Sequence, residues 1–194
     1  MMSPKYFGRP FSSVLLLLAA VSLAAFASMA TTLARMSVAQ MSLAAPLIVR
    51  ARCLGNATRW NAGEIWTFTS FAVEEVWKGS APAQIDVRLL GGTAGNLTST
   101  VAGIPRFRQG ETVVLFLEPT SRGDFSVLSW EQGTFRVRQN ARGAGEAATE
   151  DTASFPTLDP ATRRFDVSGI HDLPVDALRQ QVRAALSAGV ARKP

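Results

Sequence analysis

Apolar residues recur at every second position along most of the chain beyond residue 46. This period of two is typical of β-strands with one buried face, and it restricts the fold more than any other feature of the sequence. The alternation is clear in Leu47 to Leu54, in Gln84 to Leu90 and in Thr134 to Gln139. Thr112 to Glu118 is nearly all apolar, which is typical of a central strand buried on both faces. We therefore expect a mainly β fold, a small barrel of about five to six antiparallel strands.

The segment Glu64 to Trp77 predicts a long, aromatic strand whose apolar phase changes along its length. Trp66 and Phe68 share one phase, whereas Phe71 belongs to the other. Because one inserted residue moves all later side chains to the opposite face, we expect a bulge near Thr69. Long bent strands of this kind allow a small sheet to close on itself.

Two segments lack a clear strand pattern. Residues 91–111 are rich in glycine and polar residues, and we expect a long connection with a short strand at Leu97 to Val101. Phe125 to Glu131 and Thr134 to Gln139 predict either one strand interrupted at Gly133 or two short strands. Residues 140–164 are polar and poor in aromatic residues, which indicates a mobile loop or a loose hairpin.

The clearest helical pattern lies at the end of the chain. An apolar stripe at helical spacing is formed by Val175, Leu178, Val182 and Leu186. We expect Asp172 to cap this helix, Pro174 to lie in its first turn and Gly189 to end it. Such a stripe indicates an amphipathic helix packed on the barrel. A second, short helix is expected at Ser37 to Ala44, with Ser37 as its cap.

The first thirty residues have the layout of a secretory signal peptide. Lys5 and Arg9 precede an uncharged apolar run from Val14 to Phe26, and small residues follow. The run is shorter than the roughly twenty residues that cross a bilayer as a helix. Cleavage after Ala30 fits best, cleavage after Ala27 is an alternative, and an uncleaved anchor is a third reading. We expect an exported protein that is periplasmic, cell-surface or extracellular and meets the membrane only during export or through an uncleaved signal.

These patterns predict the following domain organisation. Residues 1–30 form the signal peptide and residues 31–46 a short helical segment. The β-barrel domain spans 47–170, with a mobile loop at 140–164, and the helix with its tail occupies 171–194.

Cysteine content and charge restrict the class of protein further. Cys53 is the one cysteine of the chain, so no internal disulfide can form and the fold depends on its core. We expect Cys53 to be buried as a small apolar residue. Lys5 and Arg9 contribute two of the five net positive charges, so the mature chain has only a mild basic excess. This excess is far below that of nucleic-acid-binding domains, and we expect no nucleic acid partner.

Two segments of the sequence resemble the netrin-like modules typified by tissue inhibitors of metalloproteinases. The first runs from Phe71 to Gly79 and ends in Lys78-Gly79, and the second runs from Pro105 to Leu117. Those modules have a strand ending in a Lys-Gly turn, followed later by a phenylalanine, a glycine turn and an apolar strand. The chain also resembles uncharacterised exported bacterial proteins with this order of motifs. The resemblance covers roughly residues 47 to 118 and implies an OB-like, five-stranded barrel with helices packed on it.

The predicted mature N-terminus departs from the pattern of these inhibitors. In them, an N-terminal cysteine held by a disulfide places its amine and carbonyl on a catalytic zinc ion. Here the first mature residue would be Thr31, and no disulfide is available to fix it. The resemblance therefore supports a fold, and metalloprotease inhibition remains an alternative function.

The sequence offers few residues for catalysis or metal binding. His171 is the one histidine of the chain, and no nucleophile motif surrounds any serine. One histidine and one cysteine do not supply the three or four ligands that zinc requires. A carboxylate-dependent hydrolase using Glu74 and Asp86 is an alternative, but we expect these side chains to be solvated. We predict no catalytic residue, no metal site and no cofactor, and therefore no enzyme.

Another hypothesis assigns ligand binding to cationic and aromatic side chains. OB-like barrels often bind ligands on a face lined with rings and positive charge. The candidates are Arg88, Arg136, Arg138 and Trp77. Most of the four tryptophans are nevertheless expected in the core.

These observations favour an exported, non-enzymatic binding or interaction protein. Its expected partner is an unknown protein at the cell surface or outside the cell, and a secreted protease is one possibility within this class. A module that binds anionic glycans or lipid head groups through the arginine face is an alternative, as is the carboxylate-dependent hydrolase.

Overall fold

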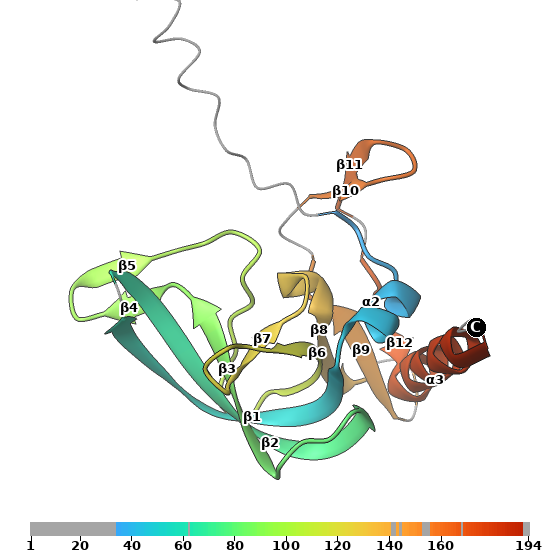
Figure 1. Ribbon diagram of the computed structural model, residues 1–194, viewed down its shortest axis with the longest axis horizontal. Coiled ribbons are helices and arrows are strands. Elements are labelled where there is room, and N and C mark those ends of the chain that lie inside the picture. The colour runs from blue at the N-terminus through green and yellow to red at the C-terminus, as the bar shows by residue number, and fades with distance from the viewer. Residues whose placement is uncertain are drawn as a thin grey trace, which may run out of the picture. The chain divides into compact units, whose positions relative to one another are not determined.

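The computed structural model describes residues 34–61, 63–140, 143, 145–152, 156–167 and 169–191. The predicted signal peptide, its cleavage positions and Thr31 lie outside these residues. The described elements are, in order, α2 (Val38–Ala44), β1 (Leu47–Asn61), β2 (Glu64–Lys78), β3 (Gln84–Leu90), β4 (Gly92–Ala94), β5 (Leu97–Ser99), β6 (Thr112–Pro119), β7 (Phe125–Val127), the 3-10 helix η1 (Trp130–Gly133), β8 (Thr134–Gln139), β9 (Glu146–Glu150), β10 (Thr157–Asp159), β11 (Arg164–Asp166), β12 (Leu173–Pro174) and α3 (Val175–Ala191) (Figure 1).

Five strands pair in a closed ring, in the order β1, β2, β3, β7, β6 and back to β1. β8, β9 and β12 extend the sheet from β6. The pairing of β3 with β7 is parallel, and the other pairings in the ring are antiparallel. The structure confirms a mainly β protein with a C-terminal helix. The expectation that the strands are all antiparallel is wrong for β3 and β7, because five strands cannot alternate in direction around a closed ring and one neighbouring pair must be parallel.

The ring separates two apolar cores. One core fills the ring and contains Phe71 and Leu115, and the other lies between the outside of β1, β6 and β8 and the two helices. Met41 from α2 and Leu178 from α3 belong to this second core together with Phe116. Leu115 and Phe116 are adjacent in β6, and both are fully buried. The predicted burial of this strand on both faces is therefore confirmed.

The short helix α2 begins and ends with side-chain hydrogen bonds. The hydroxyl oxygen of Ser37 accepts from the backbone N–H of Gln40, and the Gln40 side chain accepts from the backbone N–H of Ser37. This capping box confirms Ser37 as the predicted cap. At the other end, Lys78 Nζ donates to the carbonyls of Ser42 and Leu43 at 2.8 and 3.0 Å. The lysine that ends β2 thus satisfies carbonyls that the helix leaves free.

The C-terminal helix α3 carries the predicted stripe but differs from the prediction at both ends. Val175, Leu178 and Val182 are buried, which confirms the stripe. The helix begins at Val175, directly after β12, so Asp172 does not cap it and Pro174 precedes its first turn. β12 pairs with β9, and this pairing holds the residues before the helix in an extended conformation. No described helix is long and apolar enough to cross a membrane.

Gly189 does not end α3, which continues to Ala191. A Cβ atom at this position would lie 2.4 Å from Leu43 Cδ2 of α2. The glycine therefore allows close packing of the two helices.

The predicted bulge at Thr69 in β2 is wrong. The inner face of this strand keeps a single phase, formed by Ile65, Thr67, Thr69 and Phe71. Trp66 and Phe68 lie on the other face. The register shift near this point lies in β1, between the pairs Cys53 with Phe71 and Gly55 with Ser70. Two inward threonines made the apolar pattern of the sequence look like a change of phase.

Residues 140–164, expected as a mobile loop or a loose hairpin, contain a strand of the main sheet. β9 pairs with β8, and Ala147 and Ala148 are buried. β10 and β11 then form a separate hairpin. Small side chains on β9 gave no visible apolar pattern, and this explains the missed strand.

Candidate functional site

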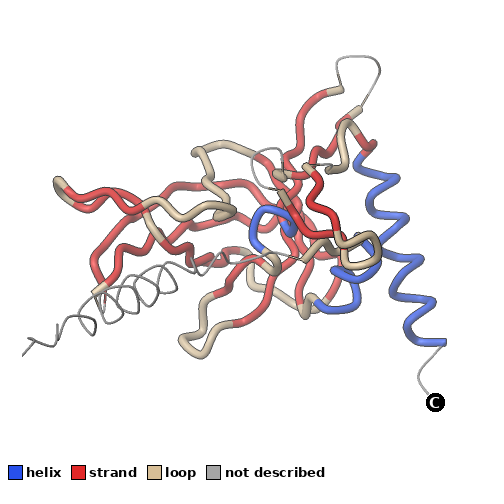
Figure 2. The backbone as a smooth tube through the Cα atoms, turned by 90° about the horizontal axis from the view of Figure 1, so that it is seen from above, coloured by secondary structure: helices blue, strands red, loops and turns tan. Residues whose placement is uncertain are grey.

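The outer parts of β1 and β2, residues 55–61 and 64–70, and the β4–β5 hairpin form a region that we call the arm. Figures 1 and 2 place the arm on the side of the ring opposite α3. The two long strands remain paired as far as Asn61 and Glu64 at the hairpin end. The arm consequently presents a face that the second core and the helices do not cover.

One face of the arm changes from apolar to polar and back with distance from the ring. Side chains of directly opposite residues in an antiparallel pair lie on the same face. The pairs on this face, going outward, are Cys53 with Phe71, Asn56 with Thr69, Thr58 with Thr67, and Trp60 with Ile65. A band of amide and hydroxyl groups therefore lies between the apolar core and a terminal tryptophan.

The β4–β5 hairpin lies against this polar band. A Cβ atom at Gly92 would approach Thr67 Oγ1 to 2.4 Å and the Thr58 methyl carbon to 2.6 Å. Gly92 also has a φ of +134°, a conformation that side chains rarely adopt. Glycine is thus required for both the backbone conformation and the close approach.

A hollow of about 430 Å³, which we call the threonine groove, opens between the arm and the loop before β6. Thr67 and Thr69 at its inner end are 6% and 0% exposed. Among the described residues that line it, Arg106 alone is charged. The lining residues are Asn56, Thr58, Thr67, Thr69, Leu89, Gly92, Thr93, Thr98, Ser99, Thr100, Arg106 and Phe107.

A second hollow of about 450 Å³, which we call the tryptophan hollow, shares Thr98 and Ser99 with the threonine groove. Trp60 and Leu97 line it, and they are 56% and 53% exposed. A tryptophan this exposed, next to a similarly exposed leucine, leaves a large apolar surface in water. Such a surface marks a contact site more often than an isolated apolar residue does.

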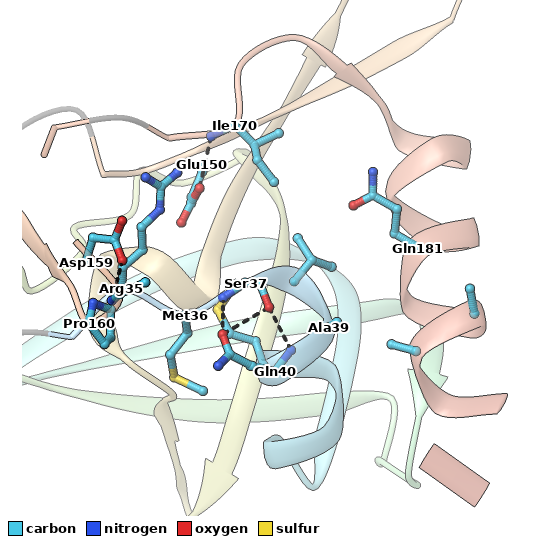
Figure 3. A pocket seen from close by; sticks show the side chains of 15 residues that line it. Arg35, Met36, Ser37, Ala39, Gln40, Glu150, Asp159, Pro160, Ile170 and Gln181 are labelled. Carbon is cyan, nitrogen blue, oxygen red and sulfur yellow. Dashed lines mark hydrogen bonds between the residues drawn. The ribbon is translucent and has the colours of Figure 1, made fainter. Parts of the chain in front are cut away.

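A further hollow, of about 840 Å³, lies between α2, α3 and the β10–β11 turn (Figure 3). Figure 3 shows Arg35 between Asp159 and Glu150. Burial raises the pKa of Glu150, whose Oε2 accepts a hydrogen bond from the backbone N–H of Ile170 at 3.0 Å. Arg35 also forms an ion pair with Asp166 at 3.5 Å. The charged side chains that line this hollow interact with one another, so fewer of them are available to bind a ligand than the volume of the hollow indicates.

Arg88, the first predicted ligand-binding residue, lies on β3 at the edge of a small hollow of about 200 Å³. Its guanidinium carbon is 4.7 Å from the centre of the Trp66 ring, and its Nε is 3.7 Å from Asp124 Oδ2. The side chain is only 13% exposed. Arg88 therefore contacts a ring and a carboxylate of its own chain.

Arg136 and Arg138 lie on β8 and differ in surroundings. Arg136 donates to Glu111 and Asp151, each at 2.5 Å, and to the carbonyl of Arg106 at 2.8 Å. Burial opposes the charged form of Arg136, but the two carboxylates outweigh it and the pKa is raised. Arg138 is exposed. Arg136 thus fixes the backbone of the arginine in the threonine groove, while Arg138 faces solvent.

Trp77 lies on β2 against the second core. Its indole N–H donates to Glu75 Oε2 at 2.9 Å, and Arg179 Nη2 from α3 donates to the same oxygen at 2.6 Å. The guanidinium of Arg179 lies 5.4 Å from the centre of the Trp77 ring. These contacts join α3 to β2. The four predicted ligand-binding residues are therefore bound to different partners within the chain or, in the case of Arg138, solvated.

The two carboxylates named for a hydrolase are separately engaged. Burial would raise the pKa of Glu74, but hydrogen bonds from Arg52 and Arg50 hold it below its ordinary value. Asp86 accepts from the Ser70 hydroxyl at 2.5 Å. In the described part of the chain, no three histidine, cysteine or acidic side chains are grouped to hold a metal ion.

Glu131 on η1 is the one described carboxyl group whose pKa is raised to about 7. Burial is the main cause, the nearby charge of Asp151 adds to it, and Arg136 opposes it. Glu131 Oε2 is buried without a hydrogen-bond partner among the described residues.

The expectation that most tryptophans lie in the core is met only in part, because Trp77 and Trp130 pack against the two cores whereas Trp60 is exposed. The fully buried apolar set contains no tryptophan, and Trp66, Trp77 and Trp130 are only half-buried. The sequence analysis did not assign ligand binding to Asn56, Thr58 or Arg106. A usable signal was present, because Thr58 and Trp60, and likewise Thr67 and Thr69, have the two-residue spacing of one strand face.

No protein-family model matches the chain, and no curated protein matches it.

Proposed function

We propose that this chain is an exported, non-enzymatic binding module whose recognition surface is the arm. The observation that carries the proposal is the exposure of Trp60 at 56% and Leu97 at 53%, both of which line a hollow at the end of the arm. Tryptophan is among the residues that contribute most to binding when a partner covers them. The partner would be a molecule at the cell surface or in the medium.

The order of the strands supports an OB-like description of the ring. OB-folds are five-stranded barrels that bind ligands at a strand face and at the loop between the first two strands. The ring here has five strands, and the arm includes the outer parts of β1 and β2, the first two strands of the ring. A netrin-like relationship agrees with this arrangement, and the arm would be the surface that such a module presents.

Export is part of the proposal and has a separate test. Lys5, Arg9 and the apolar run that follows support a cleavable signal. N-terminal sequencing of the product from the envelope or the medium is expected to begin at Thr31, or at Ser28 if cleavage follows Ala27. Recovery of the chain only from the cytoplasm, with Met1 in place, would contradict export.

The binding role is tested with immobilised mature protein and native envelope and secreted fractions. We expect the wild type to retain a specific component and Trp60→Ala to lose most of it. Phe165→Ala is the matched control, because Phe165 is an aromatic residue of β11 with 61% exposure that lies outside the arm. Equal retention by wild type and Trp60→Ala, or loss with Phe165→Ala alone, would exclude the arm as the recognition surface.

A further inference from the structure

The threonine groove has a composition that fits a particular class of ligand. On an otherwise apolar inner face, Thr67 and Thr69 place two hydroxyl groups where valine would fill nearly the same volume. Burying a hydroxyl group is unfavourable unless it forms hydrogen bonds. Strand packing alone does not explain these polar residues, and the hydrogen bonds that they form in the groove explain them in part.

The hydrogen bonds within the groove do not use all of the hydroxyl hydrogens and lone pairs of its threonines. Thr67 Oγ1 donates to the carbonyl of Gly91 at 2.7 Å, so the 3.0 Å hydrogen bond between Thr58 and Thr67 is donated by Thr58. The Thr58 oxygen then retains lone pairs that can accept. Opposite them, Thr93 and Thr98 are 3.0 Å apart, and only one of these hydroxyls can donate to the other. One hydroxyl hydrogen of this pair remains for another acceptor.

Asn56 contributes a further donor at the inner end. Its Oδ1 accepts from Thr69 at 2.6 Å, and its Nδ2 donates to the carbonyl of Phe107 at 2.9 Å. An amide nitrogen carries two hydrogens, so one N–H of Asn56 stays available. A ligand that matches this set must both donate and accept at closely spaced points. Sugar hydroxyl groups do both, whereas an apolar ligand would leave the band unpaired.

Arg106 places a cation at the edge of the groove. Its Nη2 donates weakly to the carbonyl of Ser99 at 3.3 Å, and the residue is exposed. Arg136 holds its backbone carbonyl, as described above. Guanidinium groups bind carboxylate and sulfate in a planar, two-point geometry. A ligand with an acidic group at one end of a sugar ring would meet this cation.

Trp60 supplies the remaining component at the outer end. The tryptophan hollow and the threonine groove share Thr98 and Ser99, so a ligand longer than one sugar ring can extend from one into the other. A half-exposed indole provides a flat apolar surface on which the C–H face of a sugar ring can stack.

From this combination we infer that the arm binds an acidic saccharide. Sugar hydroxyls would contact the threonines and Asn56, the acidic group would contact Arg106, and a neighbouring sugar would stack on Trp60. The inference rests on the proposed binding function and specifies its ligand class. Two or more linked sugars are required, because Arg106 and Trp60 line different hollows.

The test measures binding of defined oligosaccharides to the mature protein by titration calorimetry. The probes are a uronic acid oligomer of several units, a neutral glucose oligomer of the same length, the free uronic acid and inorganic sulfate. We expect the acidic oligomer to bind at least tenfold more tightly than the other three. If sulfate or the free uronic acid binds as tightly as the acidic oligomer, the arm binds a simple anion and the saccharide inference is wrong.

Single substitutions test which residues contact the oligosaccharide. Arg106→Gln is expected to reduce affinity for the acidic oligomer about tenfold, to the level of the neutral oligomer. Arg59→Gln is the matched control, because Arg59 lies on the opposite face of the arm, 3.9 Å from the Phe68 ring centre. Thr58→Val removes a hydroxyl with little change of volume and should weaken both oligomers several-fold. Unchanged affinities in Arg106→Gln and Thr58→Val, with folding verified by circular dichroism, would overturn the inference.

Failure of the inference can be distinguished from failure of the proposed function. If no oligosaccharide binds but wild type retains a protease-sensitive envelope component that Trp60→Ala loses, the arm recognises a protein and the saccharide is wrong. If Trp60→Ala retains as much as wild type and no oligosaccharide binds, both are wrong.

Discussion

At the scale of single residues, Arg136 and Arg138 share a strand but differ in their surroundings. Arg136 is one of two arginines on β8 that the sequence marks as ligand-binding, but its guanidinium is held by Glu111 and Asp151. Its side chain is 19% exposed. Alternation along a strand identifies which side chains share a face, but it does not show which acidic residues from distant segments will meet them.

Substitution of the two β8 arginines should separate their roles. We expect Arg136→Gln to lower the free energy of unfolding by about 2 to 4 kcal/mol, because two carboxylates lose their shared partner. Arg138→Gln should change it by no more than about 0.5 kcal/mol. Urea unfolding of both variants checks this, and similar effects would show that the Arg136 ion pairs contribute little.

Glu131 should make stability depend on pH. Its pKa is raised in the folded protein from an ordinary 4.5 to about 7, so folding favours the protonated form. The wild type should be most stable, as far as this group is concerned, below about pH 4.5 and should lose stability as the pH rises to about 7.

Glu131→Gln keeps the neutral form at every pH. The variant should therefore gain stability over wild type between about pH 4.5 and 7, reaching on the order of 2 kcal/mol above pH 7. Urea unfolding at pH 4.5, 6 and 8 measures the difference. A constant difference across this range would contradict the raised pKa.

At the scale of elements, the β4–β5 hairpin offers a direct test of the threonine groove. Gly92→Ala should destabilise the protein by about 3 kcal/mol, because it adds a clash with the threonine pair to an unfavourable φ. Gly95→Ala, in the turn of the same hairpin, meets no atom within 4 Å and should lose only about 1 kcal/mol from its φ of +62°. Thermal unfolding compares them, and equal losses would show that close approach at Gly92 is unimportant.

Element prediction from the sequence succeeded where side chains were large and regular. β3 matches its predicted bounds, β6 has the predicted two-sided burial, and Ser37 caps α2. The prediction failed where buried side chains were small or polar. The small side chains of Ala147 and Ala148 gave β9 no clear apolar pattern, and the two inward threonines of β2 led to the prediction of a bulge that is absent there.

The candidate site was less predictable than the fold for a related reason. Asn56 and Thr67 come from β1 and β2, where the register of the strand pair brings them together, and Arg106 comes from the loop before β6. The alternation of residues along one strand predicts which side chains share a face. The site also depends on the register between strands and on the position of the β4–β5 hairpin, which this alternation does not predict. The exposed Trp60 was visible in the sequence, but nothing local distinguishes it from a core tryptophan.

At the scale of the whole molecule, the fold is held without a covalent cross-link. Cys53 is 1% exposed in the core of the ring, and burial raises the pKa of its thiol. The native protein should react slowly with a thiol reagent, and denaturant should speed the reaction in parallel with unfolding. Absorbance of the released reagent measures the rate. Fast labelling of the native state would show that the ring opens locally, and a reductant should leave the unfolding midpoint unchanged.

The two cores share β6, whose successive residues point alternately into the ring and toward the helices. Loss of either core would expose half of this strand, so neither core can melt while the other stays intact. Amide hydrogens of β6 should therefore exchange with deuterium only through global opening, and they should be the last to do so. A substitution inside the ring should then also weaken the packing of α2 and α3 on the sheet, although the two cores have no side chain in common.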